Sequence, residues 1–389
     1  MVPRELLTHI SELAAQFKAV LVTGPRQAGK TTLVRAAFPD KEYVSLEEPD
    51  ERMLAETDPR RFLGRFANGA ILDEAHRVPA LFSYLQTILD NERRTGLYVI
   101  TGSQHLGLVQ SASQSLAGRL AVLTLLPFSY AELCAGGYAP PSLEDALHRG
   151  AYPPVFDQGL DPEFWYNSYI TTYVERDVRQ ILHVRDLAVF QRFVSLCAGS
   201  VGQLLNTARL GADCGVNHST VRQWLSVLEA SYVAFLLQPH HRNFRKRLVK
   251  TPKLYFWDTG LATRLLGIEA PQQLLTHPMR GALFENWVVV ELLKGRLHRA
   301  RRPNLFFWRN NAGLEIDVVA EGAAGLRPIE VKSGTTIADD WLTSLRRWVE
   351  LAGGEAGAPT IVFGGQGQRQ VHDVHILGWR EIPSLAAEV

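Results

Sequence analysis

The strongest constraint on this chain is a short, glycine-bounded loop close to its beginning. The loop runs from Gly24 to Gly29 and is followed directly by Lys30 and Thr31. Glycines have no Cβ, so the backbone amides of such a turn can converge on an oxyanion. Lys30 supplies a positive charge, and Thr31 supplies a hydroxyl for Mg²⁺. The pattern predicts a phosphate-binding loop.

The sequence on both sides of the loop has the character that this motif requires. Residues 19–22 form an apolar run typical of a buried strand, and residues 32–38 have the pattern of a helix. An ordinary glycine turn that caps a helix is the alternative interpretation. The residues that we expect to contact a bound nucleotide are Gly24, Pro25, Arg26, Gln27, Ala28, Gly29, Lys30, Thr31 and Thr32.

A second signal is the apolar strand at residues 69–72, which ends in Asp73 and Glu74. Neighbouring side chains of a strand point to opposite faces, but this pair lies where the chain leaves the sheet. We predict that Asp73 binds Mg²⁺ and that Glu74 polarises the attacking water, as adjacent carboxylates do in P-loop ATPases. The alternative is a surface acidic pair that opens the next helix.

Polar residues also stand next to two other apolar runs. Ser103 and Gln104 follow residues 97–101, where a sensor of the γ-phosphate would lie, although turns are rich in serine for steric reasons as well. Arg119 precedes residues 120–126 and is either an arginine finger acting within a homo-oligomer or a surface arginine. Short apolar strands separated by helical segments predict a parallel, doubly wound sheet.

These motifs together resemble the bacterial and archaeal AAA-type ATPases that carry, at their C-terminus, the domain of unknown function 4143. The likeness extends over essentially the whole chain. It implies an ATPase fold with a small helical lid, for which residues 165–183 are the candidate, and a restriction-endonuclease-like fold in the C-terminal domain. The stretches that carry the resemblance are residues 24–32, 71–79, 101–103, 117–119 and 126–129.

Composition narrows the class of protein further. With 389 residues, of which 46% are hydrophobic, the chain is long enough for two or three packed domains. No apolar run approaches the roughly 18 residues of a membrane span, and the first residues lack the layout of a signal peptide, so we expect a cytoplasmic protein without membrane contact. Cys134, Cys197 and Cys214 are too scattered for a disulfide framework or a zinc site.

Residues 203–238 have the layout of a helix-turn-helix. A helical segment is followed by the turn at residues 215–217 and by a second helix, whose polar side includes Arg222. We predict that this side contacts DNA phosphates or base edges. The alternatives are a winged helix that serves protein interaction or dimerisation, and a polar helix face that is simply solvated.

The formal net charge is only +1, but basic residues gather in two acid-free windows. The first window would form the basic wing of a winged helix. It holds Arg242, Arg245, Lys246, Arg247, Lys250 and Lys253. The second window holds Lys294, Arg296, Arg299, Arg301, Arg302 and Arg309.

The C-terminal third carries carboxylates in the order found in metal-dependent nucleases. Strands are predicted at residues 305–308, 314–319 and 328–332, with Asp317 on the second and Glu330 and Lys332 on the third. With Glu285 from the preceding helix, these carboxylates would hold one or two Mg²⁺ ions. Lys332 would steady the attacking water or the phosphate. The alternative is a plain ion pair between Glu330 and Lys332 on one strand face.

The sequence therefore predicts an α/β protein with a P-loop ATPase core at residues 1–135 and a helical lid or linker at 136–185. A winged-helix domain at 186–262 and a restriction-endonuclease-like domain at 263–389 follow. We expect it to bind ATP and Mg²⁺ and to use ATP hydrolysis to translocate on, unwind or remodel duplex or branched DNA, as in repair or recombination. Two alternatives stay open: an ATP-gated, metal-dependent nuclease, and an ATP-controlled regulatory protein with an inert nuclease-like domain.

Overall fold

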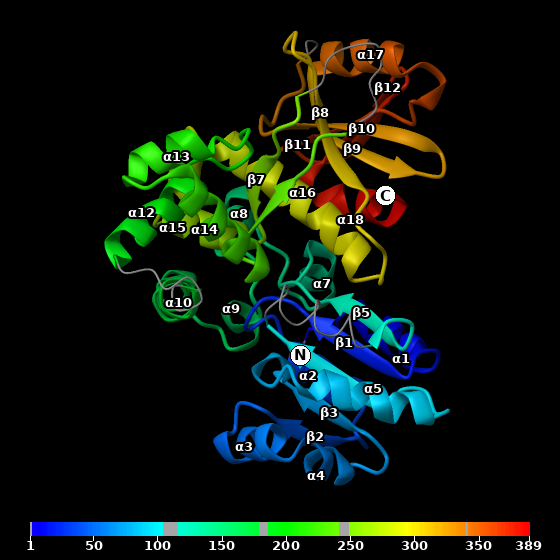
Figure 1. The fold of residues 1–389 in the computed structure, drawn as a ribbon. Coiled ribbons are helices and arrows are strands. Elements are labelled where there is room, and N and C mark those ends of the chain that lie inside the picture. Colours follow the sequence, from blue (N-terminus) through cyan, green and yellow to red (C-terminus); the bar gives the residue numbers. More distant parts are fainter. Residues whose placement is uncertain (1, 104–115, 179–185, 241–248, 339–340) are drawn as a thin grey trace. The chain divides into compact units, whose positions relative to one another are not determined.

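A computed structural model describes residues 2–103, 116–178, 186–240, 249–338 and 341–389 (Figure 1). The described chain divides into two compact units. Unit 1 comprises residues 1–128, 230–232 and 297–301, and unit 2 comprises residues 129–229, 233–296 and 302–389. The finer division into four domains stays a prediction. No described helix combines the length and the apolar character needed to cross a membrane.

Unit 1 is built on a parallel sheet, which confirms the predicted α/β core. Its described strands lie side by side in the order β2-β3-β4-β1-β5. The elements of the unit are α1 (Leu6–Ala14), β1 (Ala19–Thr23), α2 (Lys30–Ala37), β2 (Glu42–Ser45), α3 (Pro49–Thr57), α4 (Pro59–Gly64), β3 (Ala70–Asp73), η1 (Ala75–Arg77), α5 (Leu81–Asn91), β4 (Tyr98–Gly102) and β5 (Leu120–Thr124).

Helices cover both faces of this sheet because its central strands are apolar on both faces. Ala19 and Leu21 of β1 pack in a hydrophobic cluster with residues of α4 and α5. Val20 and Val22, which alternate with them, pack instead with residues of α1 and α2. The alternation decides which face of the sheet each side chain covers, and the parallel pairing with β4 and β5 sets the direction of β1. The carboxyl end of β1 leads straight into the glycine-bounded loop and α2.

Unit 2 has a helical part and a sheet part. The helical part contains α7 (Tyr130–Ala135), α8 (Leu143–Arg149), α9 (Pro153–Asp157), α10 (Pro162–Tyr169), the π-helix η2 (Ile170–Val178), α12 (Leu187–Ala198), α13 (Thr207–Cys214), α14 (His218–Ala230), β6 (Ala234–Leu237), β7 (Lys253–Phe256), α15 (Thr259–Leu265) and η3 (Pro271–Leu275). The predicted lid at residues 165–183 falls on α10 and η2, and its last residues lie outside the described residues.

The sheet part of unit 2 is mixed, which confirms a C-terminal α/β region. Its described strands lie in the order β12-β13-β11-β10-β9-β8, and β9 is antiparallel to both β8 and β10. Helix α17 packs on β9 and β10. The elements are α16 (Arg280–Leu297), β8 (Leu305–Arg309), β9 (Glu315–Gly322), β10 (Gly325–Lys332), α17 (Trp341–Ala352), η4 (Gly353–Glu355), β11 (Thr360–Phe363), β12 (Gln368–Val371), β13 (Val374–Gly378), η5 (Trp379–Glu381) and α18 (Ile382–Glu388).

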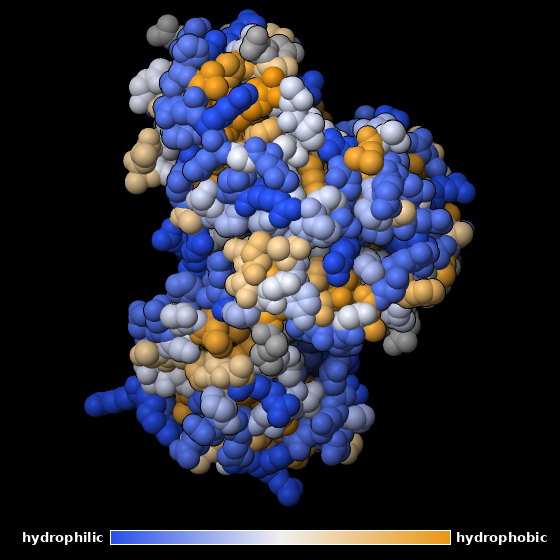
Figure 2. All heavy atoms as spheres, turned by 180° about the vertical axis from the view of Figure 1, so that it is seen from behind, coloured by the Kyte–Doolittle hydropathy of each residue, from blue (hydrophilic) through white to orange (hydrophobic). Residues whose placement is uncertain are grey.

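The face of the molecule drawn in Figure 2 is mainly hydrophilic, with apolar residues in scattered patches. Such scattered exposure is ordinary for a protein surface and marks no binding site by itself.

Candidate functional site

The loop between β1 and α2 has the backbone that its glycines predict. Gly24 has φ 143° and Gly29 has φ 90°, conformations that L-residues rarely adopt. A Cβ on Gly24 would lie 2.0 Å from the carbonyl oxygen of Leu125, so a larger residue would clash with the backbone after β5. The loop amides are thus shaped by glycine for close approach to a phosphate.

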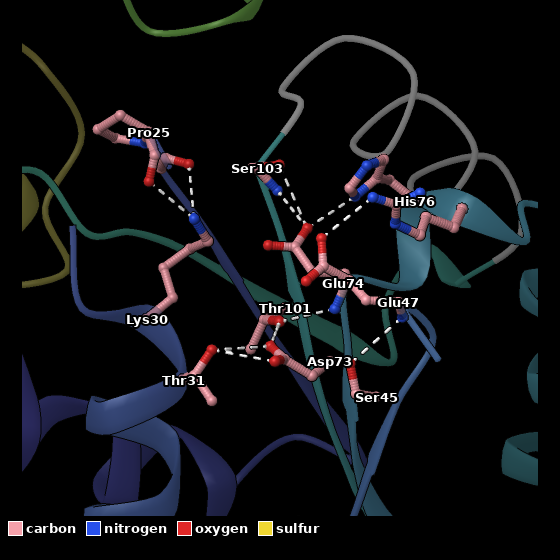
Figure 3. Close-up of polar contacts among 12 residues, drawn as sticks. Pro25, Lys30, Thr31, Ser45, Glu47, Asp73, Glu74, His76, Thr101 and Ser103 are labelled. Atoms are coloured by element: carbon pink, nitrogen blue, oxygen red, sulfur yellow. Dashed lines mark hydrogen bonds and ion pairs between the residues drawn. The ribbon is translucent and has the colours of Figure 1, made fainter. Parts of the chain in front are cut away.

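Lys30, the first residue of α2, is turned back onto this loop (Figure 3). Its Nζ donates to the carbonyl oxygens of Gly24, at 3.0 Å, and Pro25, at 2.8 Å. Burial lowers the pKa of Lys30, although the charges of Glu74 and Asp73 partly oppose this effect. A buried ammonium that is held by two carbonyl oxygens can exchange them for phosphate oxygens.

Asp73 ends β3 and is surrounded by hydroxyl groups (Figure 3). Thr31 Oγ1 donates to its two carboxylate oxygens at 3.2 and 3.0 Å, and Tyr43 Oη donates to Oδ2 at 2.7 Å. The buried Thr101 hydroxyl donates to Oδ1. Burial and the hydrogen bond to Asp73 raise the pKa of Tyr43 to about 12. The neighbouring hydroxyl of Thr31 and carboxylate of Asp73 are the oxygen donors that suit Mg²⁺, so these residues fit that ion.

Glu74 has a left-handed backbone, with φ 54°. This turn explains how adjacent residues reach the same site, because in a regular strand Asp73 and Glu74 would point to opposite faces. Oε2 of Glu74 accepts from the backbone and hydroxyl of Ser103, at 3.3 and 3.2 Å, and lies 3.0 Å from His76 Nδ1. Burial alone would raise the pKa of Glu74, but the contact with His76 and the charge of Lys30 lower it to about 2.

The structure therefore brings Lys30, Thr31, Asp73, Glu74 and Ser103 together at the carboxyl ends of β1, β3 and β4. Their catalytic roles stay predictions. Sequence reasoning gave no role to Tyr43 and Thr101, which donate hydrogen bonds to Asp73, or to His76, whose Nδ1 lies beside Glu74. A strand order would have identified Tyr43 and Thr101, since β2 and β4 flank β3, whereas His76 lies two residues after Glu74 in η1. The candidate sensor Gln104 lies outside the described residues.

Arg119 lies away from this group in its own chain. It precedes β5, and its backbone carbonyl accepts from the first residue of β1, Ala19, at the opposite end of the sheet. Its guanidinium is paired with Asp90 in α5. The proposed arginine finger would therefore have to act on another copy of the chain, and that role stays a prediction.

The predicted nuclease carboxylates line a common open pocket of about 630 Å³ in unit 2, the acid pocket. Glu285 comes from α16, Asp317 from β9 and Glu330 from β10. Burial and the charge of Asp317 raise the pKa of Glu285 to about 7 and that of Glu330 to about 8. In the part of the chain that is described, no three Asp, Glu, His or Cys side chains are grouped as a ready metal site.

Lysine ammonium groups offset the negative charge of the carboxylates in the acid pocket. Lys332 Nζ lies 2.7 Å from Glu330 Oε1, the same-strand ion pair that was the alternative interpretation of this motif. Lys253 also reaches the pocket, although its place in the first basic window predicted an exposed residue of a wing. That expectation was wrong, because Lys253 is 3% exposed. Lys294 of the second basic window is likewise buried, beside Glu291 at 2.8 Å.

The predicted helix-turn-helix corresponds to α13 and α14. Gly215 takes the left-handed conformation at the turn, and Asn217 Oδ1 accepts from Thr220 N at 2.8 Å near the start of α14. Arg222 is exposed on α14. The winged-helix assignment stays a prediction, because residues Arg242, Arg245, Lys246 and Arg247 lie outside the described residues.

Two family models match the regions of the chain that contain the five-stranded and the six-stranded sheet. An AAA domain matches residues 16–134, and a domain of unknown function, DUF4143, matches residues 280–382. The chain belongs to the AAA-type ATPases that carry a DUF4143 domain. A further domain of unknown function, DUF8612, matches residues 140–272, between the other two. P-loop ATP-binding and ATPase chemistry is the activity that this family supports.

Related sequences and structures give the extent of the likeness. Uncharacterized proteins of Mycobacterium tuberculosis and Mycobacterium bovis are each 34% identical over 340 residues, which cover 86% of this chain and 74% of the relative. The Walker-type ATPase of Pyrococcus abyssi has a TM-score of 0.46 at 15% identity, covering 68% of this chain and 96% of its own. A RuvB variant of Thermotoga maritima has a TM-score of 0.31 at 15% identity, covering 69% and 96%.

Proposed function

We propose that this chain is an ATP-dependent DNA-processing protein, in which ATP bound by unit 1 drives the translocation on, unwinding or remodelling of duplex or branched DNA. The observation that carries the ATPase half is the convergence of Lys30, Thr31, Asp73 and Glu74 at one edge of a parallel sheet. Open α/β sheets bind ligands at this edge, beyond the carboxyl ends of the strands.

Each of these residues has a task that its contacts support. Lys30 would leave the carbonyls of Gly24 and Pro25 to bind phosphate oxygens. Thr31 and Asp73 would hold Mg²⁺, which supplies charge neutralisation for phosphoryl transfer. Glu74 stays ionised in its hydrogen-bonded position and would orient the attacking water and accept its proton. Ser103, which holds Glu74, would sense the terminal phosphate.

DNA is the proposed partner because of the exposed side of α14. His218, Arg222, Gln223 and Ser226 are exposed there, while Val221, Trp224 and Leu228 face the core of unit 2. A short helix after a tight turn, with a cation and an amide on its free side, is suited to phosphate and groove contact. This side carries one arginine and no lysine, which favours recognition of DNA shape over a particular base sequence.

The ATPase rate with and without DNA tests this proposal. Forked and four-way duplexes should raise the rate, whereas Lys30→Ala should abolish turnover with every substrate. Arg222→Ala should weaken DNA binding. The number of ions released on binding, obtained from the salt dependence of the binding constant, should fall by about one. Arg60→Ala, which removes an exposed cation from α4, is the matched control. An ATPase rate that ignores every nucleic acid would favour the regulatory alternative.

Metal-dependent DNA cleavage is the second candidate, supported by the position of Glu285, Asp317 and Glu330 around the acid pocket. The test is digestion of linear and branched DNA with Mg²⁺ or Mn²⁺, in the wild type and in Asp317→Ala. Cleavage that disappears in the variant would support a nuclease. Absence of cleavage across these substrates would remove this candidate and leave the ATPase proposal intact.

A further inference from the structure

Lys253, the first residue of β7, directs its ammonium group into the acid pocket. Its Nζ lies 2.9 Å from Glu285 Oε1 and 2.6 Å from Glu315 Oε1. The Phe307 ring lies beside it, with its centroid 5.5 Å from Nζ. A buried ammonium is costly without such partners, because it has lost its water. Lys253 is therefore a cation shared by these two carboxylates, and Arg309 pairs with the second oxygen of Glu315 at 3.0 Å.

The same strand also fixes the direction of the Glu285 carboxylate. Tyr255 Oη donates to Glu285 Oε1 at 2.5 Å, so that one oxygen accepts from both Lys253 and Tyr255. The two donors alternate along β7 and hence lie on the same face of the strand. The Glu285 carboxylate, which comes from α16, is thus held by two side chains of β7, the strand that pairs with β6.

The acid pocket also contains a buried carboxylate oxygen that accepts no hydrogen bond from the described residues. Glu330 is 6% exposed, and its Oε2 has no hydrogen-bond partner among the described residues. Its Oε1 is paired with Lys332, and Asp317 Oδ2 accepts from the backbone of Val331 at 2.8 Å. A buried carboxylate oxygen without a donor is unfavourable and indicates a missing cation or donor at this position.

We infer that Lys253 takes the place of a divalent cation beside Glu285 and Glu315, and that the acid pocket binds a divalent metal ion only when this ammonium is withdrawn or removed. A divalent ion prefers carboxylate oxygens, and it cannot share Glu285 Oε1 with an ammonium at hydrogen-bond distance without strong repulsion. The inference rests on the second candidate function for the choice of carboxylates, but it concerns ion binding and not cleavage.

The arrangement links the strand β7 to ion binding by the carboxylates of the acid pocket. Lys253 and Tyr255 belong to the region that matches DUF8612, whereas Glu285, Glu315 and Glu330 belong to the region that matches DUF4143. A displacement of β7 by a few ångströms would remove both donors from Glu285 together. Metal binding in the pocket is thereby coupled to the position of β7.

The test is Mn²⁺ binding to the full chain without nucleotide, followed by electron paramagnetic resonance. Lys253→Met keeps the length of the side chain and removes its charge, so it should bind Mn²⁺ in the pocket at least about tenfold more tightly than the wild type. Lys253→Arg keeps the cation, and Tyr255→Phe removes only the neutral donor of Glu285. Both should remain within a few-fold of the wild type.

A double variant assigns the bound ion to its site. Adding Asp317→Asn to Lys253→Met should cancel the gain, whereas Asp73→Asn, in unit 1, should leave it. Equal affinities of the wild type and Lys253→Met would overturn the inference, as would a gain that survives Asp317→Asn. Failure of DNA cleavage in any of these proteins would count against the nuclease candidate alone.

The wild type provides a second measurement if Lys253→Met does not fold. Amine-directed labelling of Lys253, followed by mass spectrometry, should be slow without metal and faster in millimolar Mn²⁺, because the displaced ammonium becomes accessible. Lys250, which is exposed, serves as the internal control and should label equally in both conditions. Labelling of Lys253 that does not respond to Mn²⁺ would contradict the displacement.

Discussion

Asp73 in unit 1 and the glutamates of the acid pocket in unit 2 differ in whether a lysine ammonium contacts them directly. In unit 1, Asp73 accepts hydrogen bonds from the hydroxyls of Thr31, Tyr43 and Thr101. In unit 2, Glu285 and Glu330 are paired with lysine ammonium groups. A hydroxyl orients a carboxylate without cancelling its charge, whereas an ammonium orients and neutralises it. Asp73 is thus prepared to receive a cation, while the acid pocket already contains cations.

The acid–base behaviour of the two sites differs accordingly. The pKa of Glu74 falls to about 2, because its contact with His76 and the charge of Lys30 outweigh the effect of burial. The pKa of Glu285 rises to about 7, because burial and the charge of Asp317 outweigh the effect of Lys253. The unfavourable effect of burying carboxylates close together in one pocket is therefore larger than the attraction that Lys253 supplies. A divalent ion would reduce the repulsion among these carboxylates.

The largest effect is expected from Glu74→Gln. The variant keeps the shape of the side chain but removes its capacity to accept a proton, so kcat for ATP hydrolysis should fall by roughly 10²–10⁴-fold. Nucleotide affinity, measured with a fluorescent ATP analogue, should change little. Glu47→Gln removes a nearby, more exposed carboxylate and should leave kcat close to the wild-type value. Full activity of Glu74→Gln would show that this carboxylate is not the base.

Lys253→Ala should destabilise unit 2 strongly. Removing one partner of a buried ion pair leaves Glu285 without a cation, although Arg309 still pairs with Glu315, so the free energy of unfolding should fall by about 3–5 kcal/mol. Urea unfolding measures the change, and Lys250→Ala provides an exposed lysine of the same window as a control, with an expected change below about 0.5 kcal/mol. Similar stabilities for the two variants would mean that the ion pairs of Lys253 contribute nothing net.

Thr101→Val should have a smaller effect, confined to unit 1. The substitution keeps the shape of a fully buried side chain and removes its hydrogen bond to the charged Asp73, which should cost about 1.5–3 kcal/mol of stability. Thermal unfolding detects this loss. Mg²⁺-dependent ATPase activity should also fall, because Asp73 loses a group that orients it. If Thr101→Val unfolds like the wild type, this hydroxyl does not support Asp73.

Tyr43→Phe should produce the smallest change of the series. Tyr43 donates to the same carboxylate, but it is 37% exposed, so water can replace its hydroxyl. The expected loss of stability is about 1 kcal/mol or less. Comparison of the two unfolding temperatures tests whether burial decides the strength of each hydroxyl contact. A larger loss in Tyr43→Phe than in Thr101→Val would reverse that order.

The sequence predicted those parts of the fold and site that depend on neighbouring residues in the chain. The loop from Gly24 to Lys30 is recognisable because its glycines and lysine have a fixed spacing, and Asp73 ends a clear apolar strand. The parallel sheet of unit 1 followed from alternating strands and helices, and the α/β region at the C-terminus followed from its predicted strands and the family resemblance.

The parts of the candidate sites that the sequence did not predict depend on which strands become neighbours. Thr101 and Tyr43 meet Asp73 because β4 and β2 flank β3, and no local pattern states that order. Lys253 shows the same limit for charge. In the sequence it is one of a run of basic residues, for which solvent exposure is the usual expectation. Its burial is decided by carboxylates more than 30 residues further along the chain.

The position of Lys253 and Tyr255 in the chain also affects any attempt to divide this protein into parts. The predicted boundary before residue 263 would separate both residues from Glu285, which they hold by hydrogen bonds. A C-terminal fragment cut there would retain the carboxylates of the acid pocket but lose these two donors. Ion binding or DNA cleavage measured on such a fragment would then describe the fragment and not the protein from which it came.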